Sequence, residues 1–256
     1  MNATGRWVVL QHVAYEGLGT IAPAVSDRGA ELAVARIDRG DPVPAPGAVA
    51  GMAGLVVMGG PMSVHDAAAW LSDERALLRA AVKAGLPVLG VCLGAQQLAA
   101  ALGAEVTRGP APEVGVGEVH LTPDALHDPV FGAARTPLPC VHWHADTFAL
   151  PEGAVRLAGN DAYANQAFRV GARAYGLQFH VEVTAALVAH WGPHLPPGVF
   201  VRAPDVAHVS RAGDSIIRRF VALAGERDSG CWACRSRPCA PLPWAFPIRP
   251  RRRTTT

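Results

Sequence analysis

Residues 86–102 read LPVLGVCLGAQQLAAAL and place a cysteine between two apolar segments of different period. The first segment, residues 87–91, is short, begins with a proline and is rich in aliphatic residues, which predicts a buried strand of a parallel sheet. The second, residues 93–102, is rich in the helix formers Ala, Leu and Gln. Cys92 therefore lies at a sharp strand-to-helix turn, and Gly90 and Gly94 allow the backbone to turn tightly there.

A cysteine at such a turn fits two interpretations. The turn can present the sulfur above the sheet as a nucleophile, and the N-terminus of the following helix favours the thiolate. Free cysteine is also among the most buried residue types, and from the turn alone the packing role is the more ordinary interpretation. The rest of the chain has to decide between them.

The segments before residue 86 alternate between strand and helix patterns. Strands are expected at residues 7–12, 31–37 and 55–58, with a helix before residue 29 and a one-sided apolar helix at residues 66–84. This alternation is typical of βαβ units, in which a parallel sheet carries helices on both faces.

After residue 103 the strand patterns are short and are separated by Gly, Pro, Asn or Asp, which predicts antiparallel strands added at the sheet edge. These patterns span residues 104–107, 114–121, 138–143, 155–158, 166–170 and 173–179. Helical spacing returns at residues 184–191 and 214–223. The sequence therefore predicts an α/β fold with a mostly parallel sheet, flanking helices and antiparallel edge strands.

Composition limits the class of protein. Half of the 256 residues are hydrophobic and 17% are charged, so one large domain is expected at residues 1–225. No apolar run reaches about 18 residues and no basic-then-apolar leader begins the chain, which predicts a cytoplasmic protein without a membrane span. Residues 1–225 carry a net charge of −3, so no nucleic-acid surface is expected. Five cysteines in a chain of this length fit a reducing compartment.

Residues 226–256 have a different composition, with seven Arg, five Pro and a net charge of +5. This composition predicts a disordered tail. Cys231, Cys234 and Cys239 are spaced somewhat like a zinc knuckle, but the tail contains no histidine to complete four ligands. No metal site is expected there.

Two further segments bear on Cys92. Gly59-Gly60-Pro61 ends a predicted strand, where glycines leave backbone N–H groups free to bind a negative oxygen, although such a pair also makes an ordinary turn. The other segment ends in His180-Val-Glu182. A histidine at a strand end can be a plain surface residue, but strand alternation places His180 and Glu182 on one side, where the carboxylate can orient the imidazole as a base.

With these residues assembled, residues 7–192 resemble the class I glutamine amidotransferase domain, the triad type with a flavodoxin-like sheet. The matching segments are GVCLGAQ at 90–96, GGP at 59–61 and FHVE at 179–182. In more detail the chain is similar to stand-alone members related to the amidotransferase half of GMP synthase, through MGGPM at 58–62, EVG at 113–115 and WHAD at 143–146.

The resemblance implies that Cys92 attacks the γ-carboxamide of glutamine, that His180 relays the proton to the departing ammonia, and that Glu182 orients His180. It implies oxyanion and substrate contacts for Gly59, Gly60, Leu93, Gln96, His144 and Asp146, and no cofactor. Val181 replaces a proline found in many members, which should be tolerated. Ala145 replaces the usual glycine of the Trp-His-Gly-Asp segment, which puts the substrate contacts of that segment in doubt.

The expected activity is ammonia release from glutamine through a cysteine thioester. The ammonia goes to a synthase on another chain, since only the tail follows residue 223, or the protein hydrolyses a γ-glutamyl small molecule by itself. The alternative is a non-catalytic flavodoxin-like binding module, against which the intact Cys-His-Glu set argues. His142 and His144 share a strand face and could ligate a metal, but no third ligand is evident nearby, so no metal is expected.

Overall fold

A single mixed sheet lies at the centre of the molecule. The computed structural model describes residues 5–225, and within them nine strands pair in the order β2-β1-β3-β4-β9-β8-β7-β5-β6. The predicted tail at residues 226–256, with its three cysteines, lies outside the described residues.

The first five strands of this order are all parallel. They are β2 (Glu31–Arg36), β1 (Arg6–Gln11), β3 (Met52–Val57), β4 (Val88–Val91) and β9 (Ala174–Leu177). With β9 as the fifth strand, the order 2-1-3-4-5 is that of a flavodoxin-like sheet. The predicted α/β class with a mostly parallel sheet is confirmed.

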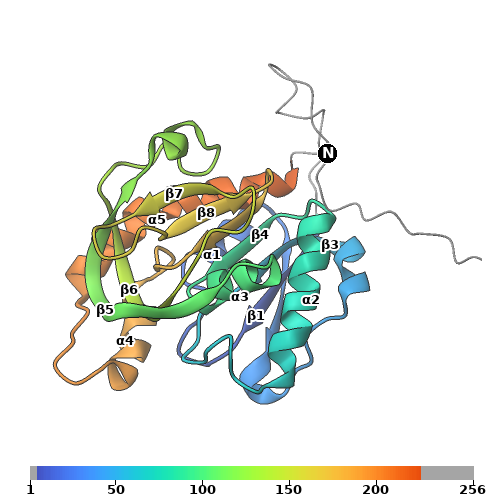
Figure 1. Cartoon of the computed structure of the whole chain (residues 1–256), viewed down its shortest axis with the longest axis horizontal. Helices are drawn as coiled ribbons and strands as arrows, with labels where there is room; N and C mark the ends of the chain where they lie inside the picture. Colours follow the sequence, from blue (N-terminus) through green and yellow to red (C-terminus); the bar gives the residue numbers. More distant parts are fainter. Residues whose placement is uncertain (1–4, 226–256) are drawn as a thin grey trace, which may run out of the picture. The chain divides into compact units, whose positions relative to one another are not determined.

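Helices cover both faces of the parallel strands (Figure 1). They are α1 (Ile21–Ser26), α2 (Ala69–Lys83), α3 (Leu93–Ala101), α4 (Ala185–Trp191) and α5 (Ala203–Ala222). Alternation along β1 sets the two faces, because Trp7 and Val9 pack with α1 and α5 while Val8 and Leu10 pack with α2 and α3. Both faces of the parallel strands are therefore buried in hydrophobic cores, which agrees with the continuous apolar runs of these strands.

Antiparallel strands extend the sheet beyond β9, as predicted. They are β8 (Ala167–Val170), β7 (Val155–Gly159), β5 (Val106–Leu121) and β6 (Leu138–Phe148). β5 and β6 form a long two-stranded ribbon. Figure 1 shows this ribbon curving away from the parallel strands.

Two elements differ from the sequence prediction in their bounds. The two strands expected at 104–107 and 114–121 are one strand, because the Gly- and Pro-containing stretch between Arg108 and Glu113 is absorbed as an irregularity in the β5–β6 pairing. α5 begins at Ala203, eleven residues before the expected start, because its first half is polar on the solvent side and buries only Val206 and Val209. No helix within residues 5–225 is long and apolar enough to cross a membrane.

Candidate active site

Cys92 lies between β4 and α3 in a strained backbone conformation, with φ 52° and ψ −107°. It is the only residue other than glycine with a positive φ in the described part of the chain. Such a conformation costs about 1–3 kcal/mol and persists only where surrounding structure enforces it. Here the Cys92 N–H donates to the Leu177 carbonyl at 2.7 Å, and the Cys92 carbonyl accepts from the first turn of α3.

The two glycines beside Cys92 are required by close backbone approach. A Cβ on Gly94 would lie 2.0 Å from the Val57 carbonyl oxygen, and a Cβ on Gly90 would lie 2.4 Å from the Gly94 carbonyl oxygen. The sharp strand-to-helix turn predicted from the sequence is present, and it rests on β3 as well as on β4.

His180 and Glu182 are brought together, with His180 Nδ1 2.7 Å from Glu182 Oε1 and both residues 1% exposed. They follow the end of β9, and a bridge to Val141 of β6 holds the His180 backbone in place. Burial lowers the pKa of His180, but the Glu182 charge, helped by Cys92, more than compensates and raises it well above the usual value. The other ring nitrogen, Nε2, has no hydrogen-bond partner among the described residues.

The Cys92 thiol is buried and lies 3.5 Å from the Trp143 carbonyl oxygen of β6. Burial raises the pKa of Cys92, while His180 and the Leu93 N–H act in the opposite direction without cancelling the effect. The sequence analysis expected the helix N-terminus to favour the thiolate, which would lower the pKa of Cys92. Desolvation by burial acts in the opposite direction and is the larger contribution, so the pKa rises. Cys140, inside β6, has its pKa raised well above the usual value by burial.

Gly59 and Gly60 follow the end of β3 and are packed closely against neighbouring side chains. The Gly59 carbonyl lies 3.0 Å from His12 Nδ1, and His12 Nε2 lies 2.8 Å from Glu74. A Cβ on Gly60 would lie 3.2 Å from the Leu93 side chain, so the two predicted oxyanion residues are neighbours.

Gln96 is joined to Cys92 through a residue that the sequence analysis did not single out. The Gln96 amide donates to the Gln178 side chain at 3.2 Å and to the Asp146 carbonyl at 3.3 Å, and the Gln178 amide lies 3.8 Å from the Cys92 sulfur. Gln178 stands two residues before His180, and strand alternation from that histidine is the signal that could have found it.

Glu16 was also missed. It lies in the loop after β1 and is 6% exposed, and one carboxylate oxygen lies 1.9 Å from where a Cβ on Gly59 would stand. Burial is the main reason that the pKa of Glu16 rises to about 7, with Glu182 adding to the rise and His180 opposing it. No sequence pattern marks Glu16, because its contacts come from three separate loops.

The predicted contacts of His144 and Asp146 are mainly within the protein. His144 lies between Glu113 and the Asp146 carbonyl, at 2.9 Å and 3.0 Å from its two ring nitrogens. The Asp146 carboxylate accepts from Ser63 at 3.2 Å. Their part in binding a substrate stays a prediction.

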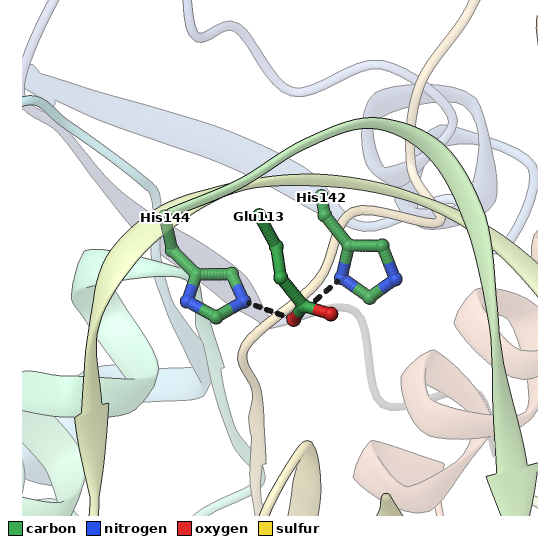
Figure 2. Close-up of side chains that lie close together, drawn as sticks. All are labelled: Glu113, His142 and His144. Atoms are coloured by element: carbon green, nitrogen blue, oxygen red, sulfur yellow. Dashed lines mark hydrogen bonds and ion pairs between the residues drawn. The ribbon is translucent and has the colours of Figure 1, made fainter. Parts of the chain in front are cut away.

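A third potential metal ligand does stand beside His142 and His144, contrary to the sequence expectation. Glu113 of β5 projects between the two histidines of β6, and one ligand atom from each residue lies within 4.8 Å of the others (Figure 2). Glu113 is about 30 residues away in sequence, and antiparallel pairing places it directly opposite His144. Sequence spacing alone could not show this.

Comparison with known proteins agrees with the geometry. The family model "Glutamine amidotransferase class-I" matches residues 18–189. The glutamine amidotransferase-like protein YfeJ of Salmonella typhimurium is 32% identical over 182 residues, covering 69% of this chain and 75% of that protein. A GMP synthase (glutamine-hydrolyzing) of Porphyromonas gingivalis is 33% identical over 137 residues, covering 53% of this chain and only 26% of the synthase.

Two solved structures are similar over most of the chain. A glutamine amidotransferase from Thermotoga maritima has a TM-score of 0.75 at 27% identity, covering 88% of this chain and 99% of that one. A glutamine amidotransferase from Methylobacillus flagellatus has the same TM-score at 30% identity, covering 89% and 97%.

Proposed function

This chain belongs to the class I glutamine amidotransferase family, and we propose that it releases ammonia from the glutamine side chain through a thioester on Cys92. His180 is the proposed base, and Glu182 the residue that orients it. The observation that carries the proposal is the asymmetry of His180: Nδ1 is fixed by Glu182 at 2.7 Å, while buried Nε2 has no partner within the described residues.

The proposed reaction has two halves. The Cys92 thiol gives its proton to His180 Nε2, and the sulfur attacks the side-chain carbonyl carbon of glutamine to form a tetrahedral intermediate. Collapse breaks the C–N bond as the imidazolium returns the proton to nitrogen, which releases ammonia and leaves the glutamyl thioester. Water then attacks the thioester with His180 as base, and glutamate leaves as the thiol re-forms.

We assign the oxyanion site to the backbone N–H groups of Gly60 and Leu93, because the Leu93 N–H interacts with the Cys92 sulfur and the Leu93 side chain lies beside Gly60. Burial keeps the thiol protonated, and Glu182 makes His180 a stronger base, so the sulfur is proposed to ionise as its proton passes to His180. Gln96, Gly59, His144 and Asp146 are proposed to form the substrate wall, with Gln178 linking Gln96 to the sulfur.

The ammonia acceptor is proposed to be a synthase on another chain. The support comes from the GMP synthase relative, whose printed name couples synthesis to glutamine hydrolysis and of which this chain covers about a quarter. A hydrolase acting alone on another γ-glutamyl compound is the competing function.

Ammonia release tests the proposal. Glutamine is compared with a panel of γ-glutamyl amides, using the wild type, Cys92→Ala and His180→Ala, with His190→Ala as the matched control because His190 is exposed on α4. We expect turnover of glutamine in the wild type and the control alone. Turnover of another γ-glutamyl amide in preference to glutamine would support the independent hydrolase, and turnover by Cys92→Ala would refute the thioester.

A further inference from the structure

The residues Glu113, His142 and His144 form a cluster, called the ribbon cluster below, on one face of the β5–β6 ribbon. Glu113 pairs with His144 across the ribbon, and His142 is two residues away on the same face. Figure 2 shows both imidazole rings directed at the Glu113 carboxylate. Glu113 Oε2 lies 2.9 Å from His144 Nε2 and 3.6 Å from His142 Nδ1.

The hydrogen bonds of His144 indicate that the ribbon cluster needs a cation. His144 Nδ1 lies 3.0 Å from the Asp146 backbone carbonyl, which only accepts, so Nδ1 must carry the proton. In a neutral ring Nε2 then carries a lone pair, and this lone pair faces a carboxylate oxygen at 2.9 Å. Two acceptors at that distance repel each other unless a cation lies between them.

His142 presents a second ring nitrogen to the Glu113 carboxylate. Its Nε2 lies 3.3 Å from the Cys140 sulfur, while buried Nδ1 has no hydrogen-bond partner among the described residues. This unpartnered atom points at the same carboxylate oxygen that His144 faces. One cation at the centre of the cluster would satisfy both rings and the carboxylate.

We propose that the ribbon cluster binds one divalent transition-metal ion, with Zn²⁺ the best match, through Glu113 Oε2, His142 Nδ1 and His144 Nε2. Imidazole and carboxylate ligands lie about 2.0–2.2 Å from zinc. Tetrahedral geometry then separates neighbouring ligand atoms by roughly 3.3 Å. The distances from Glu113 Oε2 to His144 Nε2, 2.9 Å, and to His142 Nδ1, 3.6 Å, lie on either side of that value.

The surroundings of the ribbon cluster resemble the outer shell of a metal site. Ligating histidines usually anchor their second ring nitrogen, and ligating carboxylates are themselves hydrogen-bonded. The Asp146 carbonyl and Cys140 sulfur anchor the rings, while Asn160 and Gln166 donate to Glu113 at 2.8 Å and 2.6 Å. A carboxylate has lone pairs enough for two amides and an ion.

A proton is the competing cation. It would make His144 an imidazolium that donates to Glu113 at 2.9 Å, but it would leave buried His142 Nδ1, 3.6 Å from the same oxygen, without a hydrogen-bond partner among the described residues. The side chain of Glu113 is 18% exposed against 1% for His144, so an ion would enter past the carboxylate.

The experiment measures metal binding directly, so its result is independent of the proposed glutaminase activity. The full chain carrying Cys92→Ala, which removes the nucleophilic sulfur, is stripped of metal and titrated with Zn²⁺ by calorimetry. Metal content is measured after gel filtration. The same titration is made with Glu113→Gln and His142→Asn added, and with His208→Asn as control because His208 is exposed on α5.

We expect one equivalent of Zn²⁺ at micromolar concentration or tighter, unchanged by the control and weakened at least 100-fold by either cluster variant. Equal affinity in the cluster variants, or no retained ion, would overturn the site and leave the proton as the cation.

Binding of Co²⁺ can be measured without the cluster variants and therefore tests the site even if those variants do not fold. Bound at the ribbon cluster, Co²⁺ gives ligand-field bands without thiolate-to-cobalt charge transfer, because the three ligands are two nitrogens and an oxygen. An intense thiolate charge-transfer band would place the ion on cysteine sulfur and refute the assignment.

Discussion

Glu16 provides a sharp test of the electrostatics around the proposed catalytic residues. Its carboxylate is buried against Gly59 and shares the site with His180 and Glu182. Replacing it in Glu16→Gln keeps the shape and removes the ionisable group. We expect this variant to be more stable than the wild type above neutral pH.

The size and sign of the effect follow from linkage. Burial raises the pKa of Glu16 from 4.5 to about 7, so the folded protein binds one proton more than the unfolded chain between those values. Stability is therefore lost as the pH rises through this window, by up to about 1.4 kcal/mol for each pKa unit of the shift. The full shift corresponds to about 3 kcal/mol in the free energy of unfolding. The wild type loses this stability by pH 8, whereas Glu16→Gln has no such group to ionise and keeps it.

The assay is urea unfolding of the wild type, Glu16→Gln and Glu152→Gln between pH 5 and pH 8. Glu152 is exposed in the turn before β7 and serves as the matched control. The difference in free energy of unfolding between Glu16→Gln and the wild type should grow by about 2–3 kcal/mol over this range, while the control difference stays flat. A pH-independent difference for Glu16→Gln would refute the raised pKa.

Three further predictions concern the nucleophile. Cys92→Ala and His180→Ala should abolish ammonia release while Glu182→Gln retains on the order of 1–10%, since the orienting acid can be the least costly triad member to remove; wild-type turnover in Glu182→Gln would reduce the triad to a dyad. A glutamine-mimicking electrophile should label Cys92 before Cys140, because burial raises the pKa of Cys140 well above its usual value and the charges of Glu113 and Glu118 add to the rise; mass mapping that finds Cys140 first would contradict this. Gly94→Ala should destabilise the fold by about 1–3 kcal/mol or more, since its Cβ would lie 2.0 Å from a backbone oxygen; an unchanged urea midpoint would show that the turn can relax.

The parts predicted well from sequence are those whose causes are local. The turn at Cys92 follows from a change of period and two glycines within seven residues, and the structure shows both glycines in close backbone contact. The pairing of His180 with Glu182 follows from i, i+2 alternation, and the two side chains do meet. The parallel strands were recognised because residues buried on both faces form continuous apolar runs.

What the sequence did not show depends on contacts between distant segments. Glu113 lies opposite His144 only because the irregular stretch after Arg108 belongs to one continuous strand. The prolines and glycines in that stretch predicted a break in the strand instead. Glu16 meets Gly59 because three loops converge at the sheet edge. The pKa of Cys92 was expected to fall from the helix N-terminus, but burial decides its direction, and burial is a property of the whole fold.

Strand β6 links the ribbon cluster to the proposed nucleophile through its backbone. Val141 exchanges two backbone hydrogen bonds with His180, at 2.8 Å and 3.0 Å, and the Trp143 carbonyl lies 3.5 Å from the Cys92 sulfur. A shift of β6 by one residue would turn its side chains to the other face and replace both backbone contacts at once. Glu113 opposes that shift, since it binds β6 from the neighbouring strand. The contact of Glu113 with His144 therefore favours the register that places the proposed base beside the proposed nucleophile, and we expect its loss to disturb the proposed chemistry through geometry.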